Sequence, residues 1–437
     1  MRQEQTEPCG EPANGRSNFP GLAKKRRMSL GDMSIAAEKL LLQKILQAVG
    51  NPPVQILLWN GLEIPKQKEN TVAQVLIRDL AALLKLFLNH RLYFGELYSA
   101  KRIEVQGDLL DFLEAVFRCR PLRSANRKSD KLLLPFDEIR RNTLAGARRN
   151  IQHHYDIGND FYKLWLDERM VYTCAYFHKP DASLEQAQLA KMDHICRKLN
   201  LQPGEAVVEA GCGWGALALH MAKHYGVTVQ AYNISREQIS HARERARDEG
   251  LDGKVEFIED DYRHIRGKFD AFVSVGMLEH VGIDHYRELG EVINRVLKDD
   301  GRGLIHSIGF NFPRPMDDWA ERHIFPGASP PSLSQVMQIF EPYDFSVLDV
   351  ENLRLHYAKT LEHWLQRYED NVDRVSRMFD ENFVLAWRLY LAASITTFKI
   401  GKMQLFQLTF SRANNNRIPW TRQYLYGEEN TGMGSLG

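Results

Sequence analysis

The stretch VVEAGCGWGALALH (207–220) decides the fold of this chain. An apolar strand pattern ends at Glu209, a helical pattern begins near Ala216, and three glycines lie between them, among them Gly211 and Gly213. Glycine at these positions permits a tight turn and lets a ligand touch the backbone closely. A dinucleotide-binding fold would instead show G-x-G-x-x-G and an acidic residue about 20 positions on, at the end of the second strand. Here the second strand ends without an acid, and the acid lies just before the first glycine.

From Ile151 onward, strand-like runs alternate regularly with helical stretches. Such alternation predicts a parallel sheet covered by helices. The closing run QLFQLTFSR (404–412) predicts a last strand, and the apolar spacing across residues 360–398 predicts one or two long amphipathic helices whose aromatic stripe belongs mainly to the core. The alternating strand-like runs are AVVEAGCGWG, VTVQAYNIS, KVEFIEDDY, FDAFVSVGM and GRGLIHSIG.

The placement of the acid resembles that in class I S-adenosylmethionine-dependent methyltransferases rather than in dehydrogenases. A sulfonium cofactor also explains the loop, because no pyrophosphate has to be held at the helix N-terminus. At the end of the third strand, Asp260 and Asp261 stand where an adenine amino group needs an acceptor, and Tyr262 stands where the adenine ring can stack. We therefore predict S-adenosylmethionine as the methyl donor. The alternative is a tight strand-to-helix turn that binds no ligand.

The composition limits the classes of function. With 437 residues, 44% of them hydrophobic and 26% charged, the chain is typical of a soluble globular protein of two or three domains. Because 57 Lys and Arg balance 56 Asp and Glu, we expect no nucleic-acid partner. Five cysteines lie far apart without a C-x-x-C pair, which argues against a disulfide scaffold and a zinc site. We expect no metal and a reducing, cytoplasmic location.

The pattern of charge and hydropathy predicts four segments. Residues 1–32 form a polar, disordered tail that lacks the apolar core of a secretory signal. Residues 33–120 mix strand-like runs (VQILLWNG, RIEVQG) with helical ones (VAQVLIRDLAALLKLFL, LLDFLEAVF) and predict a small α+β domain. Residues 121–150 form a basic linker, either a solvated connector or a segment attracted to anionic lipid headgroups, and residues 151–437 form the catalytic domain. The most apolar runs fall short of the ~20 residues that cross a bilayer, so any membrane contact is expected to be peripheral.

Six blocks of the chain resemble, in the same order, the signature blocks of the cyclopropane-fatty-acyl-phospholipid synthase family and its mycolic-acid-modifying relatives. The resemblance extends from about residue 50 to residue 415. It implies a Rossmann-like, seven-stranded class I methyltransferase domain preceded by a small α+β lipid-binding domain. It also implies a homodimer that works on unsaturated acyl chains of an anionic phospholipid membrane, at its inner face. The blocks are HHYDIGNDFYKLWLDERMVYTCAYF, VVEAGCGWG, FDAFVSVGMLEHVG, LIHSIG, ERHIFPGASPPS and WRLYLAASITTFKIGKMQLFQLTFSR.

The chemistry of that family makes specific demands on a site. An isolated cis alkene is a weak nucleophile, so it must be pressed against the sulfonium methyl in a dry pocket. The carbocation that results must meet neither water nor a nucleophile, and aromatic walls tolerate it through their negative faces. A base must then remove one proton for the ring to close. A thiolate would be alkylated, so we expect Cys174 to be a neutral, weakly polar wall.

In the resembled family, a cysteine, a glutamate, a histidine, a backbone amide and a tyrosine hold a bicarbonate ion that serves as this base. The matching residues here are Cys174, Glu279, His306, the main chain of Ile308, and Tyr357. Glu279 follows the fourth strand and His306 lies in the fifth, so both are expected at the carboxyl edge of the sheet, where ligands bind. Taken alone, Cys174 would more often be a small core residue, and His306 could equally be a satisfied strand-end histidine.

The resemblance also implies contacts with the cofactor. Tyr172 and Thr173 stand where the family's Tyr-Ser pair meets the methionine part, and Gln238 stands near the ribose. The family has glycine and threonine where this chain has Ala231 and Asn233, so we expect an altered contact in that block. The predicted cofactor-binding residues are Tyr172, Thr173, Glu209, Gly211, Gly213, Asn233, Gln238, Asp261 and Tyr262.

The leading prediction is methylene transfer from S-adenosylmethionine to the cis double bond of unsaturated phospholipid acyl chains, which closes a cyclopropane ring. Plain methyl transfer to the same double bond, giving a methyl-branched chain, stays open because it shares the first step. A lipid-binding protein with a degenerate methyltransferase fold, and a methyltransferase of small molecules or proteins, are the rivals from other classes. The long loop 310–332 is expected to cover the site, with Trp319 and Phe325 suited to an acyl channel; a stabilising surface wrap is its alternative.

Overall fold

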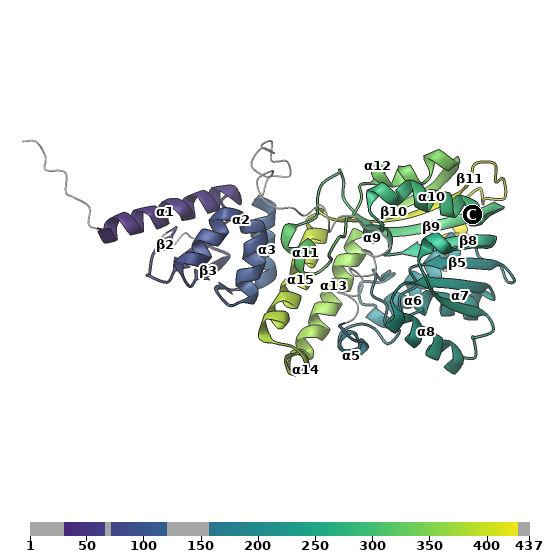
Figure 1. Cartoon of the computed structure of the whole chain (residues 1–437), viewed down its shortest axis with the longest axis horizontal. Helices are drawn as coiled ribbons and strands as arrows, with labels where there is room; N and C mark the ends of the chain where they lie inside the picture. The colour runs from purple at the N-terminus through teal and green to yellow at the C-terminus, as the bar shows by residue number, and fades with distance from the viewer. Residues whose placement is uncertain (1–29, 66–70, 120–156, 427–437) are drawn as a thin grey trace, which may run out of the picture.

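The computed structural model describes residues 30–65, 71–119 and 157–426. A small N-terminal unit (residues 30–119) lies at one end of the molecule and a large sheet at the other, with long helices between them (Figure 1). The first helix, α1 (Leu30–Ala48), begins three residues before the predicted domain boundary at residue 33. The rest of the predicted tail and the predicted basic linker, residues 121–150, lie outside the described residues.

The large sheet has seven strands in the order β10-β11-β9-β8-β5-β6-β7. The strands from β9 to β7 are all parallel, whereas β11 runs antiparallel to both of its neighbours. Parallel strands are covered on both faces, which explains why they read as nearly continuous apolar runs. The strands are β5 (Ala206–Ala210), β6 (Thr228–Asn233), β7 (Val255–Glu259), β8 (Phe269–Val275), β9 (Leu297–Gly309), β10 (Phe345–Asn352) and β11 (Gln404–Arg412).

Helices cover both faces of this sheet with two separate cores. One face packs against α6 (Leu184–Lys198), α7 (Ala216–Tyr225) and α8 (Arg236–Asp248). The other packs against α10 (Tyr286–Val296) and the short segments that precede β10. The shorter elements are α5 (Asn159–Tyr162), η1 (Tyr262–His264), α9 (Leu278–Val281), η2 (Ile283–His285), α12 (Leu333–Val336), η3 (Met337–Ile339), η4 (Glu341–Tyr343) and η5 (Gln423–Leu425).

The sequence predicted most elements of this domain. The five alternating strands and the last strand are confirmed as β5 to β9 and β11. Strand β10 was not predicted, because it is an edge strand whose side chains are mostly half-buried and include Asp349 and Glu351. The pattern across residues 360–398 divides into α13 (Arg354–Asp370), α14 (Val372–Met378) and α15 (Glu381–Lys399). The division falls where Phe379 is extended and the Asp380 side chain caps α15.

The N-terminal unit is a four-stranded sheet with three helices. Its strand order is β2-β1-β3-β4, with β1 and β3 parallel and the outer strands antiparallel to them. None of the described helices, here or in the catalytic part, is long and apolar enough to cross a membrane. The elements beyond α1 are β1 (Val54–Leu58), β2 (Glu63–Ile64), β3 (Ala73–Ile77), α2 (Leu80–Ser99), β4 (Ile103–Gln106) and α3 (Leu109–Cys119).

One secondary-structure prediction in this unit is wrong. The run Val72–Leu88 was predicted as a single helix, but its first part is strand β3 and only the part from Leu80 is helical. Alternate residues of β3 are buried, and a short apolar run fits a strand as well as a helix. The boundary is set by Asp79, whose side chain accepts a hydrogen bond from Ala82 N at 2.9 Å and caps α2.

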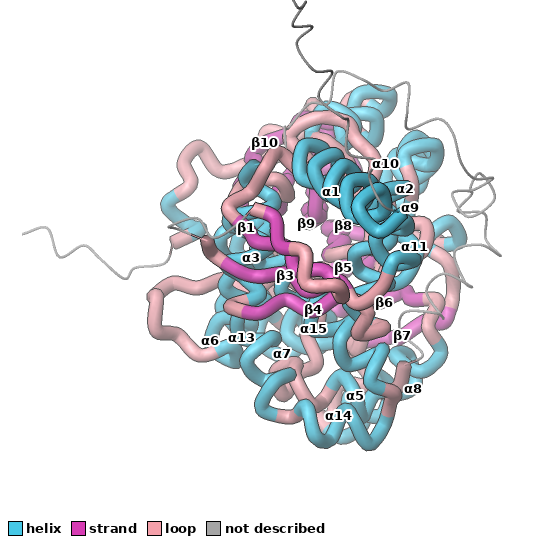
Figure 2. Tube along the Cα trace, turned by 90° about the vertical axis from the view of Figure 1, so that its left-hand side faces the viewer, coloured by secondary structure: helices cyan, strands magenta, loops and turns pink. Residues whose placement is uncertain are grey.

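The N-terminal unit and the catalytic part share a third core. Helices α2 and α3 pack against α15, and α15 packs against α13. This core runs without interruption from the small sheet through Trp165 and Trp364 to the start of β11. Figure 2, viewed from the N-terminal side, shows α1 and the small sheet in front of the large one. The unit is therefore attached to the catalytic part by apolar packing.

The loop 310–332 also packs on the N-terminal unit. It contains α11 (Asp318–His323), which packs on α2, and the indole of Trp319 is buried there. Gly95 of α2 makes the close approach possible, because a Cβ atom at this position would lie 2.4 Å from Nε1 of Trp319. The loop also lines the cavity described below, as predicted for a segment that covers the site.

Gly95→Ala is expected to destabilise the protein. Alanine gains up to ~1 kcal/mol of helix propensity, but a methyl group forced into a buried indole costs about 1–3 kcal/mol. The matched control is Gly253→Ala, where an added Cβ meets nothing within 4 Å. Urea denaturation of both variants tests this expectation. Equal stability of the two variants would show that Trp319 can shift without cost.

Candidate active site

A single cavity of about 1390 Å³ brings the predicted site residues together. It opens along the carboxyl edge of the parallel strands and continues toward the N-terminal unit. Every catalytic and cofactor-binding residue predicted from the sequence contributes to its lining. They are Tyr172, Thr173, Cys174, Glu209, Gly211, Gly213, Asn233, Gln238, Asp261, Tyr262, Glu279, His306, Ile308 and Tyr357.

The glycine loop after β5 is shaped for a close ligand. Gly211 has φ +83°, a left-handed conformation that favours glycine, and a Cβ there would lie 2.9 Å from Cβ of Met277. The amides of Gly211 and Cys212 both donate to the carbonyl of Tyr232, at 2.9 and 3.1 Å. These bonds fix the loop against the end of β6, so that its open side faces the cavity.

Glu209 is a buried carboxylate that is only partly satisfied. Its Oε2 atom has no hydrogen-bond partner among the described residues. Burial raises the pKa of Glu209 to about 7, against the opposing effect of the Lys191 charge. A ligand ammonium group would satisfy this oxygen and restore the carboxylate. Glu209 therefore suits the amino-acid end of S-adenosylmethionine.

Lys191 was not predicted as a site residue. It lies on α6, is buried, lines the cavity, and its Nζ donates to Oγ1 of Thr173 at 3.0 Å. Burial lowers the pKa of Lys191 to about 8, while the charges of Asp167 and Glu209 raise it. Its spacing of four residues from Ala187 and Ile195, both buried, was the available signal: a lysine on the apolar stripe of a helix.

Asn233 and Gln238 form one unit at the end of β6. Nδ2 of Asn233 donates to Oε1 of Gln238 at 2.7 Å and to the carbonyl of Gly213 at 3.3 Å. The amide thus links the second strand to the glycine loop. A threonine, which the resembled family has at this position, carries a single hydroxyl donor and could not make both bonds.

Asp261 and Tyr262 lie beyond β7, at the same edge. Asp261 is occupied by its own turn: Oδ1 accepts from Arg263 N at 3.0 Å and Oδ2 from Arg263 Nη1 at 3.3 Å. Tyr262 is buried, and its hydroxyl has no partner among the described residues. The guanidinium of Arg263 lies 5.0 Å from the centre of the Tyr262 ring, so the ring can offer only its other face as a flat wall. Asp261 retains acceptor capacity for an exocyclic amino group.

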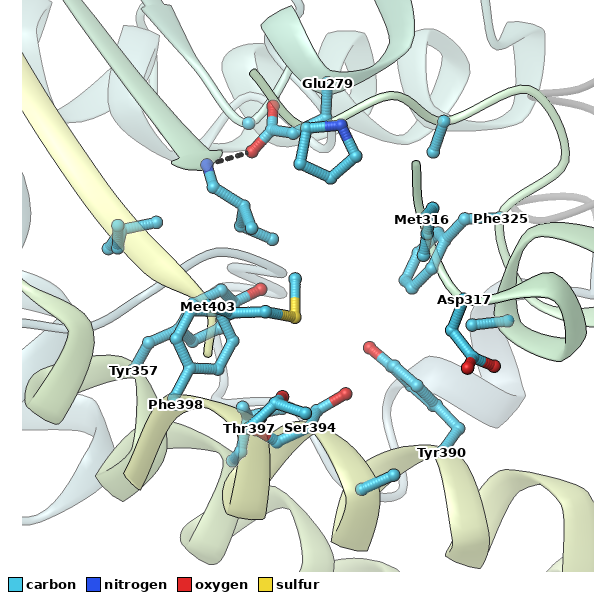
Figure 3. A pocket seen from close by; sticks show the side chains of 18 of the residues that line it. Glu279, Met316, Asp317, Phe325, Tyr357, Tyr390, Ser394, Thr397, Phe398 and Met403 are labelled. Carbon is cyan, nitrogen blue, oxygen red and sulfur yellow. Dashed lines mark hydrogen bonds between the residues drawn. The ribbon is translucent and has the colours of Figure 1, made fainter. Parts of the chain in front are cut away.

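The catalytic half of the cavity is organised by a bond between neighbouring strand ends. Val275 of β8 pairs with His306 of β9, which places the residues after both strands side by side. Oε1 of Glu279 then accepts a hydrogen bond from the main-chain N–H of Ile308 at 2.5 Å. Figure 3 draws this bond and shows Glu279 across the cavity from Tyr390 and Ser394 of α15.

Glu279 and His306 each have one side-chain polar atom that makes no hydrogen bond within the described residues. Oε2 of Glu279 and Nε2 of His306 are buried without partners among the described residues. Burial raises the pKa of Glu279 to about 7 and lowers the pKa of His306 to about 3, so the imidazole is neutral. When the amide of Gln407 donates to Nδ1 of His306, at 3.2 Å, the ring proton lies on Nε2. The cavity thus offers one acceptor and one donor to a small polar group.

Cys174 is fully buried and lies within hydrogen-bonding distance of two main-chain carbonyls, those of Ala175 and Leu353. Burial raises the pKa of its thiol far above the ordinary value, which keeps the sulfur neutral. Tyr357 lines the same side, and its ring packs on that of Phe398.

Tyr390, also missed by the sequence analysis, forms a 2.8 Å hydroxyl contact with Tyr172. It belongs to the aromatic stripe of α15 that was expected to be mainly core. Its neighbours Ser394, Thr397 and Phe398 also line the cavity (Figure 3). The stripe therefore serves as both core and cavity wall.

The residues present fit both expected small ligands. The unsatisfied oxygen of Glu209 and the open glycine loop suit the amino-acid part of S-adenosylmethionine, and the unsatisfied atoms of Glu279 and His306 suit a group that both donates and accepts, as bicarbonate does. Within the described ranges, no group of three or more metal-ligating side chains is assembled.

Comparison with known families identifies the chain. The family model described as mycolic acid cyclopropane synthetase matches residues 143–408. The chain belongs to this family. It is accordingly an S-adenosylmethionine-dependent methyltransferase of the cyclopropane-synthase type, and its seven-stranded sheet is the class I methyltransferase fold predicted from the sequence.

Individual relatives agree with this assignment. A probable fatty acid methyltransferase of Pseudomonas putida is 34% identical over 385 residues, which cover 86% of this chain and 96% of the relative. The cyclopropane-fatty-acyl-phospholipid synthase of Escherichia coli K12 is 41% identical over 287 residues, 63% of this chain and 74% of the relative. The solved structure of mycolic acid cyclopropane synthase CmaA1, complexed with SAH and CTAB, superposes with a TM-score of 0.58 at 30% identity and covers 61% of this chain and 98% of that one.

Glu279→Gln is expected to change the pH dependence of stability. Because the folded pKa of Glu279 lies near 7 and its ordinary value is 4.5, the folded state keeps a proton that the unfolded chain loses between these values. The free energy of unfolding therefore falls as pH rises through this window. Glutamine removes the effect, so the variant gains up to about 3 kcal/mol relative to the parent between pH 5 and pH 8.

Urea denaturation at both pH values measures this gain. Glu291→Gln, at an exposed position on α10, is the matched control and should follow the parent. If Glu279→Gln shows the same pH dependence as this control, the carboxyl of Glu279 does not hold its proton in the folded state.

Proposed function

We propose that this enzyme transfers a methylene group from S-adenosylmethionine to the cis double bond of an unsaturated phospholipid acyl chain and closes a cyclopropane ring. The observation that carries the proposal is that one cavity combines three features. They are a site for the methyl donor, the unpartnered polar atoms of Glu279 and His306, and a wide apolar wall. The cavity volume of about 1390 Å³ exceeds the ~300–1,000 Å³ of an ordinary small-ligand pocket, which supports two substrates held together.

The cofactor would be held by the glycine loop, Glu209, the Asn233–Gln238 pair and the wall formed by Tyr262. When bound, it supplies an electrophilic methyl group. The task of the chain is then orientation and exclusion of water. Thr173, whose hydroxyl accepts a hydrogen bond from Lys191, is one of the residues that line the cavity. Holding the alkene against the methyl group in such a site replaces a bimolecular encounter by a positioned one.

The walls around the reacting carbons protect a cation. Tyr357, Phe398 and Tyr390 present aromatic surface from α13 and α15, and Phe325 of the 310–332 loop packs edge-on against Tyr390. Aromatic faces stabilise positive charge without bonding to it. The neutral thiol of Cys174 likewise adds a polarisable surface that is not alkylated.

The base is proposed to be bicarbonate held between Glu279 and His306. A protonated Glu279, or a bicarbonate O–H pointing to its Oε2, avoids two adjacent negative charges, and Nε2–H of His306 donates to the ion. Held there, bicarbonate would supply a weak base beside the reacting carbons. Ile308 holds Glu279 in place through its main-chain N–H.

Methyl transfer without ring closure is the second candidate. It is favoured by one observation, the 34% identity to a probable fatty acid methyltransferase over 96% of that relative. Both reactions share the first step, and they differ in whether the base acts on the transferred carbon or on a neighbouring one.

An anionic phospholipid membrane is proposed as the docking partner for either reaction, since residues 118–149 hold ten Lys or Arg against three acidic residues.

Isotope transfer separates the two reactions. The full chain is incubated with vesicles of a monounsaturated phospholipid and S-adenosylmethionine that carries a trideuterated methyl group. Mass spectrometry of the acyl chains is expected to show a gain of two deuterium atoms, because one is lost on ring closure. Retention of three would establish methyl transfer, and no incorporation would overturn the proposed function.

Bicarbonate removal tests the base. Turnover in buffer freed of carbon dioxide is expected to fall at least ~10-fold and to return when bicarbonate is added, in the range of general-base effects. Glu279→Gln is expected to lower turnover about 100-fold without rescue by bicarbonate, while affinity for S-adenosylmethionine stays within about twofold. Full activity without bicarbonate would assign the proton transfer to a side chain instead.

A further inference from the structure

A buried ammonium group lines the cavity without a counter-ion. Lys191 of α6 is 2% exposed, and its Nζ has one hydrogen-bond acceptor among the described residues, the hydroxyl of Thr173 at 3.0 Å. No carboxylate oxygen of the described residues lies within 4 Å of this Nζ. An ammonium group taken out of water is unfavourable unless an anion or further acceptors meet it. Since such a group has three N–H donors, Lys191 can also bond to a ligand.

The second buried lysine of α6 shows how the fold treats a structural cation. Lys198 lies two turns farther along the helix and is also buried, but its Nζ lies 2.7 Å from Glu351 and 3.3 Å from Asp349. Lys198 does not line the cavity. Of these two lysines, the one that borders the cavity is therefore the one without a carboxylate, which indicates that the anion for Lys191 belongs to a ligand.

A buried carboxylate lines the same cavity with the opposite charge. Oε2 of Glu209 has no hydrogen-bond partner among the described residues. Burial shifts the pKa of Glu209 and that of Lys191 toward their neutral forms, and the charge of each group opposes the shift of the other. The two groups are thus close enough to attract each other, yet they are not paired. An unpaired acid and base on the wall of one cavity suit a ligand that carries both charges.

Helix α6 also fixes the hydroxyl beside Lys191. Gln188, one turn earlier on the helix, donates from Nε2 to the main-chain carbonyl of Thr173 at 2.9 Å. On the other side lies Gly276, where an added Cβ would come within 2.9 Å of Cγ2 of Thr173. The Thr173 hydroxyl, which accepts from Lys191, keeps its own proton to donate. Lys191 and Thr173 therefore form a fixed group of donors at the cavity wall.

We propose that Lys191 and Thr173 bind the carboxylate of the amino-acid part of S-adenosylmethionine, while Glu209 binds its ammonium group. The two charged groups of an α-amino acid are attached to one carbon, which matches two opposite charges that lie near each other without pairing. Lys191 thereby helps to select the methyl donor, a role that no motif of the sequence indicates. This inference rests on the proposed function, since it concerns the methyl donor of that reaction.

Three ligands separate the charges of the amino-acid part. S-adenosylmethionine carries the ammonium and the carboxylate, decarboxylated S-adenosylmethionine keeps only the ammonium, and methylthioadenosine has neither. Isothermal titration calorimetry with the full chain measures the Kd of each. The parent is expected to bind S-adenosylmethionine at least ~10-fold more tightly than the decarboxylated form, in the range of hydrogen bonds to charged groups.

Lys191→Met removes the ammonium group and keeps an unbranched side chain. The Kd for S-adenosylmethionine is expected to rise at least ~10-fold, whereas the Kd for the two ligands without a carboxylate rises no more than about twofold. Lys223→Met is the matched control, because Lys223 of α7 is exposed, pairs with Glu249 and does not line the cavity. Its three Kd values should equal those of the parent. Lys191→Gln keeps a neutral donor and should show the same pattern with a smaller change, also if Lys191→Met does not fold.

Two results would overturn the proposal. If the parent binds S-adenosylmethionine and its decarboxylated form equally, the cavity has no carboxylate site. If Lys191→Met weakens the binding of all three ligands alike, Lys191 only supports the fold. The titrations contain no lipid and are separate from the reaction. A parent that shows the expected order of ligands but modifies no unsaturated lipid would therefore overturn the proposed function alone.

Discussion

The catalytic half of the molecule depends on the hydrogen bond between Oε1 of Glu279 and the main-chain N–H of Ile308. A carboxyl group taken out of water is unfavourable unless its oxygens are satisfied, and no cation pairs with Glu279 among the described residues. The single bond can form because β8 and β9 are adjacent, parallel and in a register that pairs Val275 with His306. One sheet edge therefore sets the position of both polar groups. Burial at this edge raises the pKa of Glu279 to about 7, against the opposing effect of the Ile308 N–H.

Several buried polar atoms of the site have no hydrogen-bond partner among the described residues. Native proteins pair nearly all buried polar atoms, so an exception that borders a cavity indicates where a ligand completes the structure. Oε2 of Glu209 and the hydroxyl of Tyr262 are exceptions in the cofactor half, Oε2 of Glu279 and Nε2 of His306 in the catalytic half, and Nε of Arg91 in the N-terminal unit. These five atoms belong to residues that line the same cavity, whereas the other buried polar atoms without partners among the described residues, such as Nε1 of Trp165 and the hydroxyl of Tyr286, belong to residues that do not line it. The cavity thus has buried polar atoms without partners at three places, separated by apolar wall.

The sequence predicted the parts of this arrangement that follow from local pattern. Strand ends in an alternating α/β sequence meet at one edge, so Glu209, Glu279 and His306 could be placed together without a structure. Lys191 could not be recognised with the same ease, because its importance comes from the side chains that surround it after folding. Tyr390 was concealed for a similar reason: on a helical stripe, a wall residue and a core residue have the same spacing. The strand β3 was misread because a five-residue apolar run carries no period long enough to decide. The extension of the cavity into the N-terminal unit has no sequence signal, since its lining is the apolar pattern of any core.

The known family matches only part of the chain, and that part carries the predicted site residues. The family model covers residues 143–408, and all fourteen predicted site residues fall within that range. The match to the structure of CmaA1 covers 98% of that protein but only 61% of this chain. Much of this chain therefore has no counterpart in that mycolic acid cyclopropane synthase. The N-terminal unit adds apolar lining and Arg91 to the cavity but none of the predicted catalytic groups. The groups predicted to carry the reaction and the apolar lining added by the N-terminal unit therefore come from separate segments, which meet at the α2–α15 contact.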